Sequence, residues 1–180
     1  MILRLRTFVV VGIACIANTL TIAQSSDKVQ RVPYTSADIP ISGAVVVPPG
    51  HDTIYVSGTL PKVANASAPK GSPESFGDTK TQTMSVLQQI EETLSKQQLS
   101  MADVVMMHVY LVGDPKKDGK MDFAGMMEAY KQFFGTDQQP NKPARSTVQV
   151  AALALPGALV EIEVIAVRKR GPQAQPVLAH

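Results

Sequence analysis

The chain contains very little cysteine, histidine and tryptophan, and each shortage excludes a kind of site. Trp is absent, and Cys15 is the only cysteine in 180 residues. A single thiol forms no disulfide within the chain, and a protein that loses its N-terminal segment also lacks a cysteine nucleophile. The three histidines, at positions 51, 108 and 180, do not have the spacing of metal ligands, so we expect no metal site.

An excess of charge of one sign is also missing. The formal net charge is only +2, and without Arg4 and Arg6 the chain has as many basic as acidic residues. A near-neutral protein has no stripe of positive charge for phosphates, which argues against nucleic-acid binding. Hydrophobic residues make up 44% of the sequence and charged residues 18%, so we expect a chain of this length to build one ordinary domain.

Residues 1–23 have the layout of a secretory signal peptide. Two arginines precede an apolar run that contains small residues and ends with a plausible cleavage position after Ala23. An uncleaved anchor is the alternative, but the run from Phe8 is shorter than the roughly 20 apolar residues that a membrane span needs. A lipoprotein site at Cys15 is a further alternative. We therefore expect a periplasmic or secreted protein that has no stable membrane insertion after cleavage.

Alternating and continuous apolar runs predict several strands. The first three are expected at residues 29–34, 42–47 and 53–57, with the second and third paired as a hairpin. A loop rich in Pro, Ala, Ser and Gly follows over residues 60–75. The run at residues 104–112 is apolar on both faces, so we expect helices to cover one face and a partner subunit or a second sheet to cover the other.

Two segments have apolar residues at helical spacing. The first helix is expected over residues 78–99, where Met84, Leu87, Ile90 and Leu94 form one apolar stripe and the Gln and Thr residues are expected at the surface. The second is expected over residues 121–134. Met106, Met107, Met126 and Met127 are interpreted as gap-fillers of the core, and His108 as a packed core residue rather than a ligand.

The order of strands, helix, strand, helix and hairpin predicts an α+β domain with a mixed sheet and two helices on one face. The expected organisation is a signal peptide (1–23), a leader with an edge strand (24–42), the folded domain (43–170) and a disordered tail (171–180).

The segment 142–167 contains the residues that point most directly to a site. It is expected to form a β-hairpin of residues 145–151 and 159–167, with turn residues at 155–157. In this hairpin odd-numbered positions lie opposite each other, so Arg145 is expected beside Glu161 among mostly apolar residues. A solvated cross-strand ion pair with little effect is the alternative interpretation.

Several motifs resemble those of the RidA family, also written YjgF. They are PARSTVQV followed by EIEVIAV in residues 143–167, Tyr-Val-Ser-Gly with Leu-Pro at 55–61, Asp-Phe-Ala at 122–124, and the aromatic residues at 130, 133 and 134. The resemblance covers about residues 43–168. It implies the fold of the small trimeric chorismate mutase, a mixed sheet with two helices on one face. It also implies a homotrimer with sheet faces packed inward and clefts between subunits.

The resemblance also implies an activity and a site. Family members that have the arginine hydrolyse reactive enamines and imines, such as 2-aminoacrylate and 2-iminopropanoate, to 2-oxo acids and ammonia without a cofactor. Arg145 is then the group that holds the substrate carboxylate, and Glu161 the group that orients or activates water. Ser57, Gly58 and Thr147 are the other expected substrate-binding residues.

Three departures from the family pattern leave other functions open. Ala44 and Val45 stand where an aromatic residue is expected, Met127 replaces a polar residue, and Thr147 occupies the place of a cysteine. A non-catalytic protein that binds small carboxylates in the same cleft is therefore the main alternative. Ribonuclease activity is a third interpretation, but the sequence has no basic patch with interleaved aromatic residues.

Overall fold

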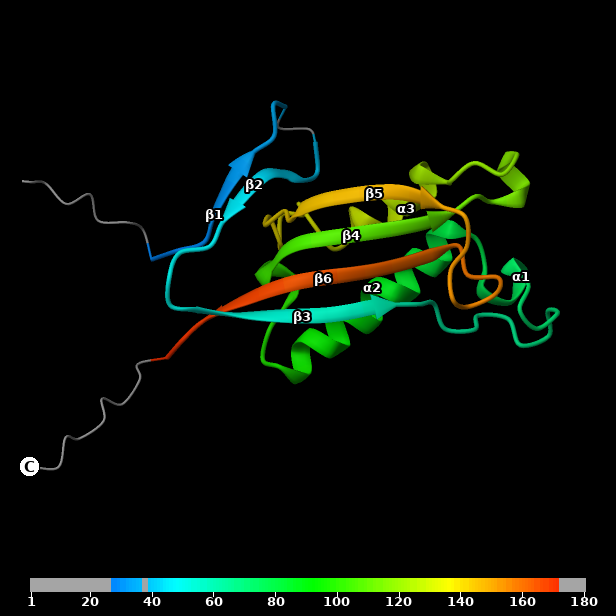
Figure 1. Ribbon diagram of the computed structural model, residues 1–180, viewed down its shortest axis with the longest axis horizontal. Coiled ribbons are helices and arrows are strands. Elements are labelled where there is room, and N and C mark those ends of the chain that lie inside the picture. Colours follow the sequence, from blue (N-terminus) through cyan, green and yellow to red (C-terminus); the bar gives the residue numbers. More distant parts are fainter. Residues whose placement is uncertain (1–26, 37–38, 172–180) are drawn as a thin grey trace, which may run out of the picture.

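Four of the six strands in the described part of the chain form one mixed sheet (Figure 1). The structure is a computed structural model that describes residues 27–36 and 39–171. The strands are β1 (Gln30–Pro33), β2 (Ser42–Val46), β3 (His51–Thr59), β4 (Val104–Val112), β5 (Ala144–Val150) and β6 (Val160–Lys169). The helices are α1 (Pro73–Phe76), α2 (Thr79–Lys96) and α3 (Phe123–Tyr130), with 3₁₀ turns at Met101–Asp103 and Pro115–Lys117.

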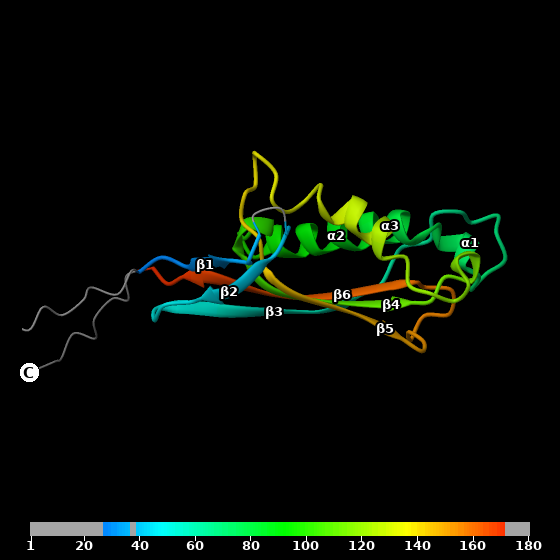
Figure 2. The ribbon, with the colours of Figure 1, turned by 90° about the horizontal axis from the view of Figure 1, so that it is seen from above.

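The helices lie on one side of this sheet, as Figure 2 shows, so the expected α+β fold is confirmed. The strand order is β3-β6-β4-β5. Strand β6 pairs antiparallel with both β3 and β4, whereas β4 and β5 are parallel. Parallel neighbours need a crossover connection, and the segment between β4 and β5 contains α3.

Both expected hairpins are wrong in their pairing, although the strands themselves are present. Strand β4 lies between β5 and β6, because its continuous apolar sequence favours a central position. The turn near Leu155 forms, with Ala158 N–H bonded to its carbonyl, but the whole connection is too long for a tight hairpin. Strand β2 likewise pairs with β1 rather than with β3, and the predicted strand at 29–34 is confirmed as β1.

The core lies between the sheet and the helices. Leu87, Ile90 and Leu94 of α2 are fully buried, and they belong to one cluster with Met107 and Leu111 of β4. Helix α2 begins at the expected place, because the side chain of Asp78 accepts a hydrogen bond from Thr81 N–H at 2.8 Å. The predicted apolar stripe is therefore confirmed for Leu87, Ile90 and Leu94, whereas Met84 is only partly buried.

The expectation that the Gln and Thr residues of α2 lie at the surface is wrong for Thr79, Gln82 and Thr83, which are all buried. The Gln82 amide accepts a hydrogen bond from Leu159 N–H at 2.7 Å and donates to Gly77 O at 2.9 Å. Buried backbone groups need partners, and Gln82 supplies them where the loop before β6 meets the helix.

The opposite face of the sheet has no covering element among residues 27–36 and 39–171 (Figure 2). Tyr55 on β3 is 76% exposed and Val148 on β5 is 47% exposed. We call this surface the open face. No helix in the described ranges is long and apolar enough to span a membrane. The expected signal peptide (1–23) and nearly all of the expected tail (171–180) lie outside the described residues.

Candidate functional site

Arg145 lies on β5, the edge strand, and its side chain is directed toward the helices. It pairs with Met107 of β4, whose side chain is buried in the core beneath the helices. The guanidinium carbon is 4.3 Å from the centre of the Tyr130 ring and 5.9 Å from that of Phe123. Both aromatic residues belong to α3, so the helix supplies the surface on which the cation rests.

The positive charge of Arg145 has no carboxylate partner in the described part of the chain. Its Nη1 atom is buried and has no hydrogen-bond partner there. Burial lowers the pKa of Arg145, and the nearby Tyr130 opposes this effect. Arginine still remains charged at neutral pH, and a buried charge is costly without a partner. A ligand carboxylate or a residue of another subunit is therefore the expected complement.

Thr147 lies two residues further along β5 and shares the same side of the strand. Its Oγ1 atom is also buried and lacks a hydrogen-bond partner among the described residues. Together with Arg145, Tyr130 and Phe123 it defines what we call the arginine half-site. Tyr130 is held firmly in it, since its hydroxyl donates to Pro40 O at 2.9 Å and burial raises its pKa.

Glu161 lies on the open face instead. It pairs with Tyr110 of β4, and a Cβ atom added to Gly58 would lie only 2.0 Å from Glu161 Oε1. The carboxylate thus occupies the space next to β3 that a side chain at position 58 would fill. Ser57 is exposed, in the irregularity of β3 between Val56 and Thr59. Glu161, Ser57 and Gly58 define the glutamate half-site.

The structure does not bring Arg145 and Glu161 together within one chain. Their partners on β4, Met107 and Tyr110, are three residues apart and therefore point to opposite faces. The expected contact of Arg145 with Glu161 is therefore wrong. In addition, β4 lies between β5, which contains Arg145, and β6, which contains Glu161. The five predicted site residues are instead divided between the two half-sites, so the predicted site is not assembled within one chain.

Sequence analysis also missed a polar cluster on the open face. His108 is not packed in the core: its side chain is 35% exposed, and Nδ1 lies 2.8 Å from Oε1 of Glu163. The hydroxyl of Tyr110 donates to the same oxygen at 3.2 Å. The alternation of side chains along the strand already placed Glu163 on the same side as Glu161. This pattern could have indicated a polar cluster on that face.

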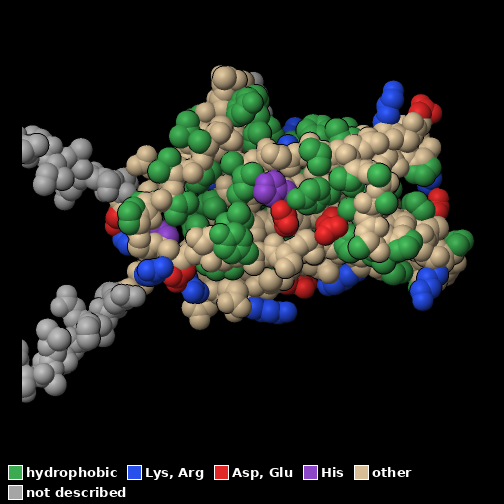
Figure 3. Space-filling view, viewed as in Figure 1, with side chains coloured by type: hydrophobic (Ala, Val, Ile, Leu, Met, Phe, Trp, Pro, Cys, Tyr) green, Lys and Arg blue, Asp and Glu red, His purple; other side chains and the backbone are tan. Residues whose placement is uncertain are grey.

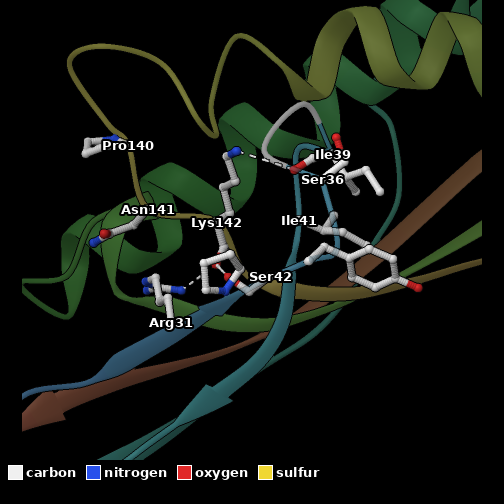
Figure 4. A pocket seen from close by; sticks show the side chains of 10 residues that line it. Arg31, Ser36, Ile39, Ile41, Ser42, Pro140, Asn141 and Lys142 are labelled. Atoms are coloured by element: carbon white, nitrogen blue, oxygen red, sulfur yellow. Dashed lines mark hydrogen bonds between the residues drawn. The ribbon is translucent and has the colours of Figure 1, made fainter.

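A cavity of about 220 Å³ lies next to the start of β5, between residues 31–36 and 39–42 on one side and residues 140–142 on the other (Figure 4). Arg31 donates from Nη1 to Lys142 O at 2.7 Å and from Nη2 to Ala102 O at 2.8 Å and Val104 O at 3.0 Å. Lys142 Nζ in turn donates to Ile39 O at 3.3 Å. These cations bind backbone carbonyls of the protein, so the cavity is a structural junction and does not hold the predicted residues.

Three comparisons relate the chain to known proteins. A family model described as Endoribonuclease L-PSP matches residues 36–168. A RutC family protein from Pyrococcus horikoshii is 36% identical over 116 residues, which are 64% of this chain and 79% of that protein. The 3-aminoacrylate deaminase RutC of Acinetobacter baylyi is 32% identical over 127 residues, which are 71% and 88% of the two chains. The solved structure of a Yersinia pestis protein of the conserved Rid protein family matches with a TM-score of 0.52 and 28% identity. The match covers 71% of this chain and 86% of that one.

Proposed function

Because the chain belongs to the RidA (YjgF) family, we propose that it hydrolyses reactive imine and enamine acids to 2-oxo acids and ammonia. The observation that carries the proposal is the arginine half-site. Arg145 presents a buried cation without a carboxylate partner among the described residues, and Thr147 adds an unpaired hydroxyl on the same side of β5. A substrate carboxylate supplies the missing charge and accepts hydrogen bonds from the planar guanidinium.

The complete site lies between subunits in this proposal. Proteins of the family are homotrimers, and the opposite placement of the two half-sites requires a second chain. The arginine half-site of one subunit then faces the glutamate half-site of its neighbour. Two observations support this arrangement. Arg145 and Thr147 have buried atoms without partners among the described residues, and the open face is uncovered, as expected for one subunit taken out of a trimer.

The chemistry needs little from the protein beyond positioning, because an imine is already electrophilic. Glu161 accepts a proton from the attacking water while the water oxygen bonds to C2 of the imine. The electrons of the C=N bond move to nitrogen, which takes up a proton. The hydroxyl proton of this carbinolamine then moves to nitrogen as the C–N bond breaks, which releases ammonia and leaves C2 as the carbonyl carbon of a 2-oxo acid. Orienting the water and the substrate supplies most of the acceleration.

The lining of the cleft favours a substrate with an apolar side chain. Phe123 beside Arg145 is 43% exposed, and in the family pattern Ala44, Val45 and Met127 stand where an aromatic residue and a polar residue are expected in the site. 2-Iminopropanoate and 2-iminobutanoate are the simplest substrates of this class, and larger apolar imino acids are expected to be turned over at least as well.

The test is release of 2-oxo acid and ammonia from 2-iminopropanoate generated in the assay, compared with buffer alone. Arg145→Ala is expected to lower kcat/KM about 10- to 150-fold, mainly through KM, since it removes charged hydrogen bonds worth about 1.5–3 kcal/mol. Glu161→Gln is expected to lower kcat about 100-fold or more. Arg168→Ala is the matched control, because that arginine is exposed at the end of β6 and far along the strand from Glu161.

The main rival is a protein that binds small carboxylates without turnover. Binding of pyruvate that depends on Arg145, together with no acceleration of hydrolysis for any imino acid tried, would establish that role and refute the enzyme. The same preparations should be incubated with RNA, because the matching family model carries the name of an endoribonuclease. No cleavage above the Arg145→Ala background is expected.

Export to the periplasm or out of the cell belongs to the same proposal. It is supported by the sequence of residues 1–23, which lie outside the described residues. Mass spectrometry of the protein isolated from its producing cells is expected to give an N-terminus at Gln24. A chain that keeps Met1 and is found with cytoplasmic proteins contradicts export but leaves the proposed chemistry untouched.

A further inference from the structure

The centre of the open face combines a histidine with two carboxylates. His108 and Tyr110 come from β4, and they pair directly with Glu163 and Glu161 of β6. In Figure 3 a histidine and two acidic side chains gather near the middle of this face, whereas Lys and Arg side chains lie toward its margins. This cluster is separate from the arginine half-site, and the proposed hydrolysis does not use His108 or Glu163.

The hydrogen bonds of the cluster determine where His108 has its lone pair. Oε1 of Glu163 can only accept, so the contact of 2.8 Å makes Nδ1 of His108 the donor. The neutral ring then has its free lone pair on Nε2. This is the usual state of a metal-binding histidine, whose other nitrogen donates to a carboxylate that fixes the orientation of the ring.

The charges on the open face also favour a cation. Glu161 forms no ion pair or hydrogen bond in the described part of the chain, and it lies two residues from Glu163 on the same side of β6. Burial, the bond to Glu163 and both carboxylates raise the pKa of Tyr110, so its phenol stays neutral and adds no coordinating anion. Packing several copies of this face together would concentrate negative charge unless a cation joined them.

One chain cannot complete a metal site, because no group of three or more possible ligands occurs among residues 27–36 and 39–171. The open face is expected to bind other copies of the same chain. It has no covering element in the described ranges, it exposes Tyr55 and Val148, and the family assembles as homotrimers. Three copies around one axis provide three imidazole ligands, and three histidines with a water molecule form a common zinc site.

We propose that the open faces of three chains together bind one zinc-type divalent cation through Nε2 of His108, with Glu163 orienting the ring. The inference rests on the homotrimer of the proposed function but not on its deaminase chemistry. The spacing of histidines in the sequence predicted no metal site because it takes account only of ligands within one chain. In a symmetric trimer, a single histidine supplies three ligands.

The experiment titrates ZnCl2 into the full, chelator-treated protein, with the bound metal measured against a chromophoric chelator and the assembly measured by light scattering. One zinc per three chains is expected. His108→Asn should weaken binding at least 100-fold, and Glu163→Gln should weaken it about 10- to 100-fold by freeing the ring. His51→Asn is the matched control and should bind as the wild type does, since His51 lies at the start of β3, paired with Lys169, and its Nδ1 contacts Pro48 O.

Three results overturn the inference: a trimer that binds no zinc at millimolar concentration, zinc binding unchanged by His108→Asn, or a protein that remains monomeric. Circular dichroism of each variant separates loss of the site from loss of the fold. A protein that binds zinc in this way but hydrolyses no imine supports the metal site and refutes the proposed function, so the two failures are distinguishable.

Discussion

At the scale of single residues, two arginines near Tyr130 have opposite environments. Burial is the main cause that raises the pKa of Tyr130, and both Arg145 and Arg31 oppose this rise. Arg31 donates to three backbone carbonyls and is thereby satisfied within the chain. Arg145 has a buried nitrogen with no partner in the described residues. The contrast indicates a structural role for Arg31 and supports the proposed ligand-binding role of Arg145.

Gly58→Ala is predicted to reduce activity with little effect on stability. The added Cβ would lie 2.0 Å from Glu161 Oε1, so the carboxylate must move away from the position where it meets the water. We expect kcat to fall about 10-fold or more, as a misplaced general base does, while Tm changes by only a few degrees. Steady-state kinetics and thermal unfolding measure the two effects.

Gly171→Ala is the control for that variant, because a Cβ at this position meets nothing within 4 Å. It should behave as the wild type in both measurements. Unchanged kcat in Gly58→Ala would show that the position of Glu161 does not matter for turnover.

At the scale of elements, the β1–β2 hairpin is attached to the sheet by few groups. Figure 4 shows Arg31 directed toward the start of β5, where Ser42 Oγ also donates to Lys142 O at 2.6 Å. Ser42 N–H bonds to Pro143 O at 2.9 Å. The hairpin therefore depends on the segment that leads into the strand of Arg145, and it fixes where that strand begins.

Arg31→Ala is predicted to lower the free energy of unfolding by about 2–4 kcal/mol, since it removes charged hydrogen bonds and leaves partly buried carbonyls without a donor. Chemical denaturation measures the change. Arg168→Ala is the matched control and is expected to cost at most about 1 kcal/mol, because its bonds are at the surface. Equal losses in the two variants would contradict the anchoring role of Arg31.

At the scale of the whole molecule, the uncovered sheet face is the proposed trimer interface. Val148→Glu is predicted to weaken trimer formation at least about 10-fold, because it places a charge where an apolar side chain is to be buried. Val63→Glu is the matched control, since Val63 is also exposed but belongs to the loop after β3. Light scattering over a range of concentrations measures both. A fully trimeric Val148→Glu protein would place the interface elsewhere.

Much of the fold was predictable because local patterns determine local structure. Alternation located β5 and β6, and the apolar stripe with Asp78 located α2. The order of strands was not predictable from the turn near Leu155, since a formed turn does not require its flanking strands to pair. Gln82 shows the same limit: its burial depends on backbone groups of a distant loop, which no periodicity records.

The placement of Arg145 and Glu161 on opposite faces has a consequence for inheritance. If each site takes its arginine from one chain and its glutamate from another, two different defective alleles can compensate for each other. A cell with one gene lacking Arg145 and another lacking Glu161 assembles mixed trimers in which some sites have both residues. Such a cell regains part of the activity that neither allele provides alone, whereas a site confined to one chain would give no such rescue.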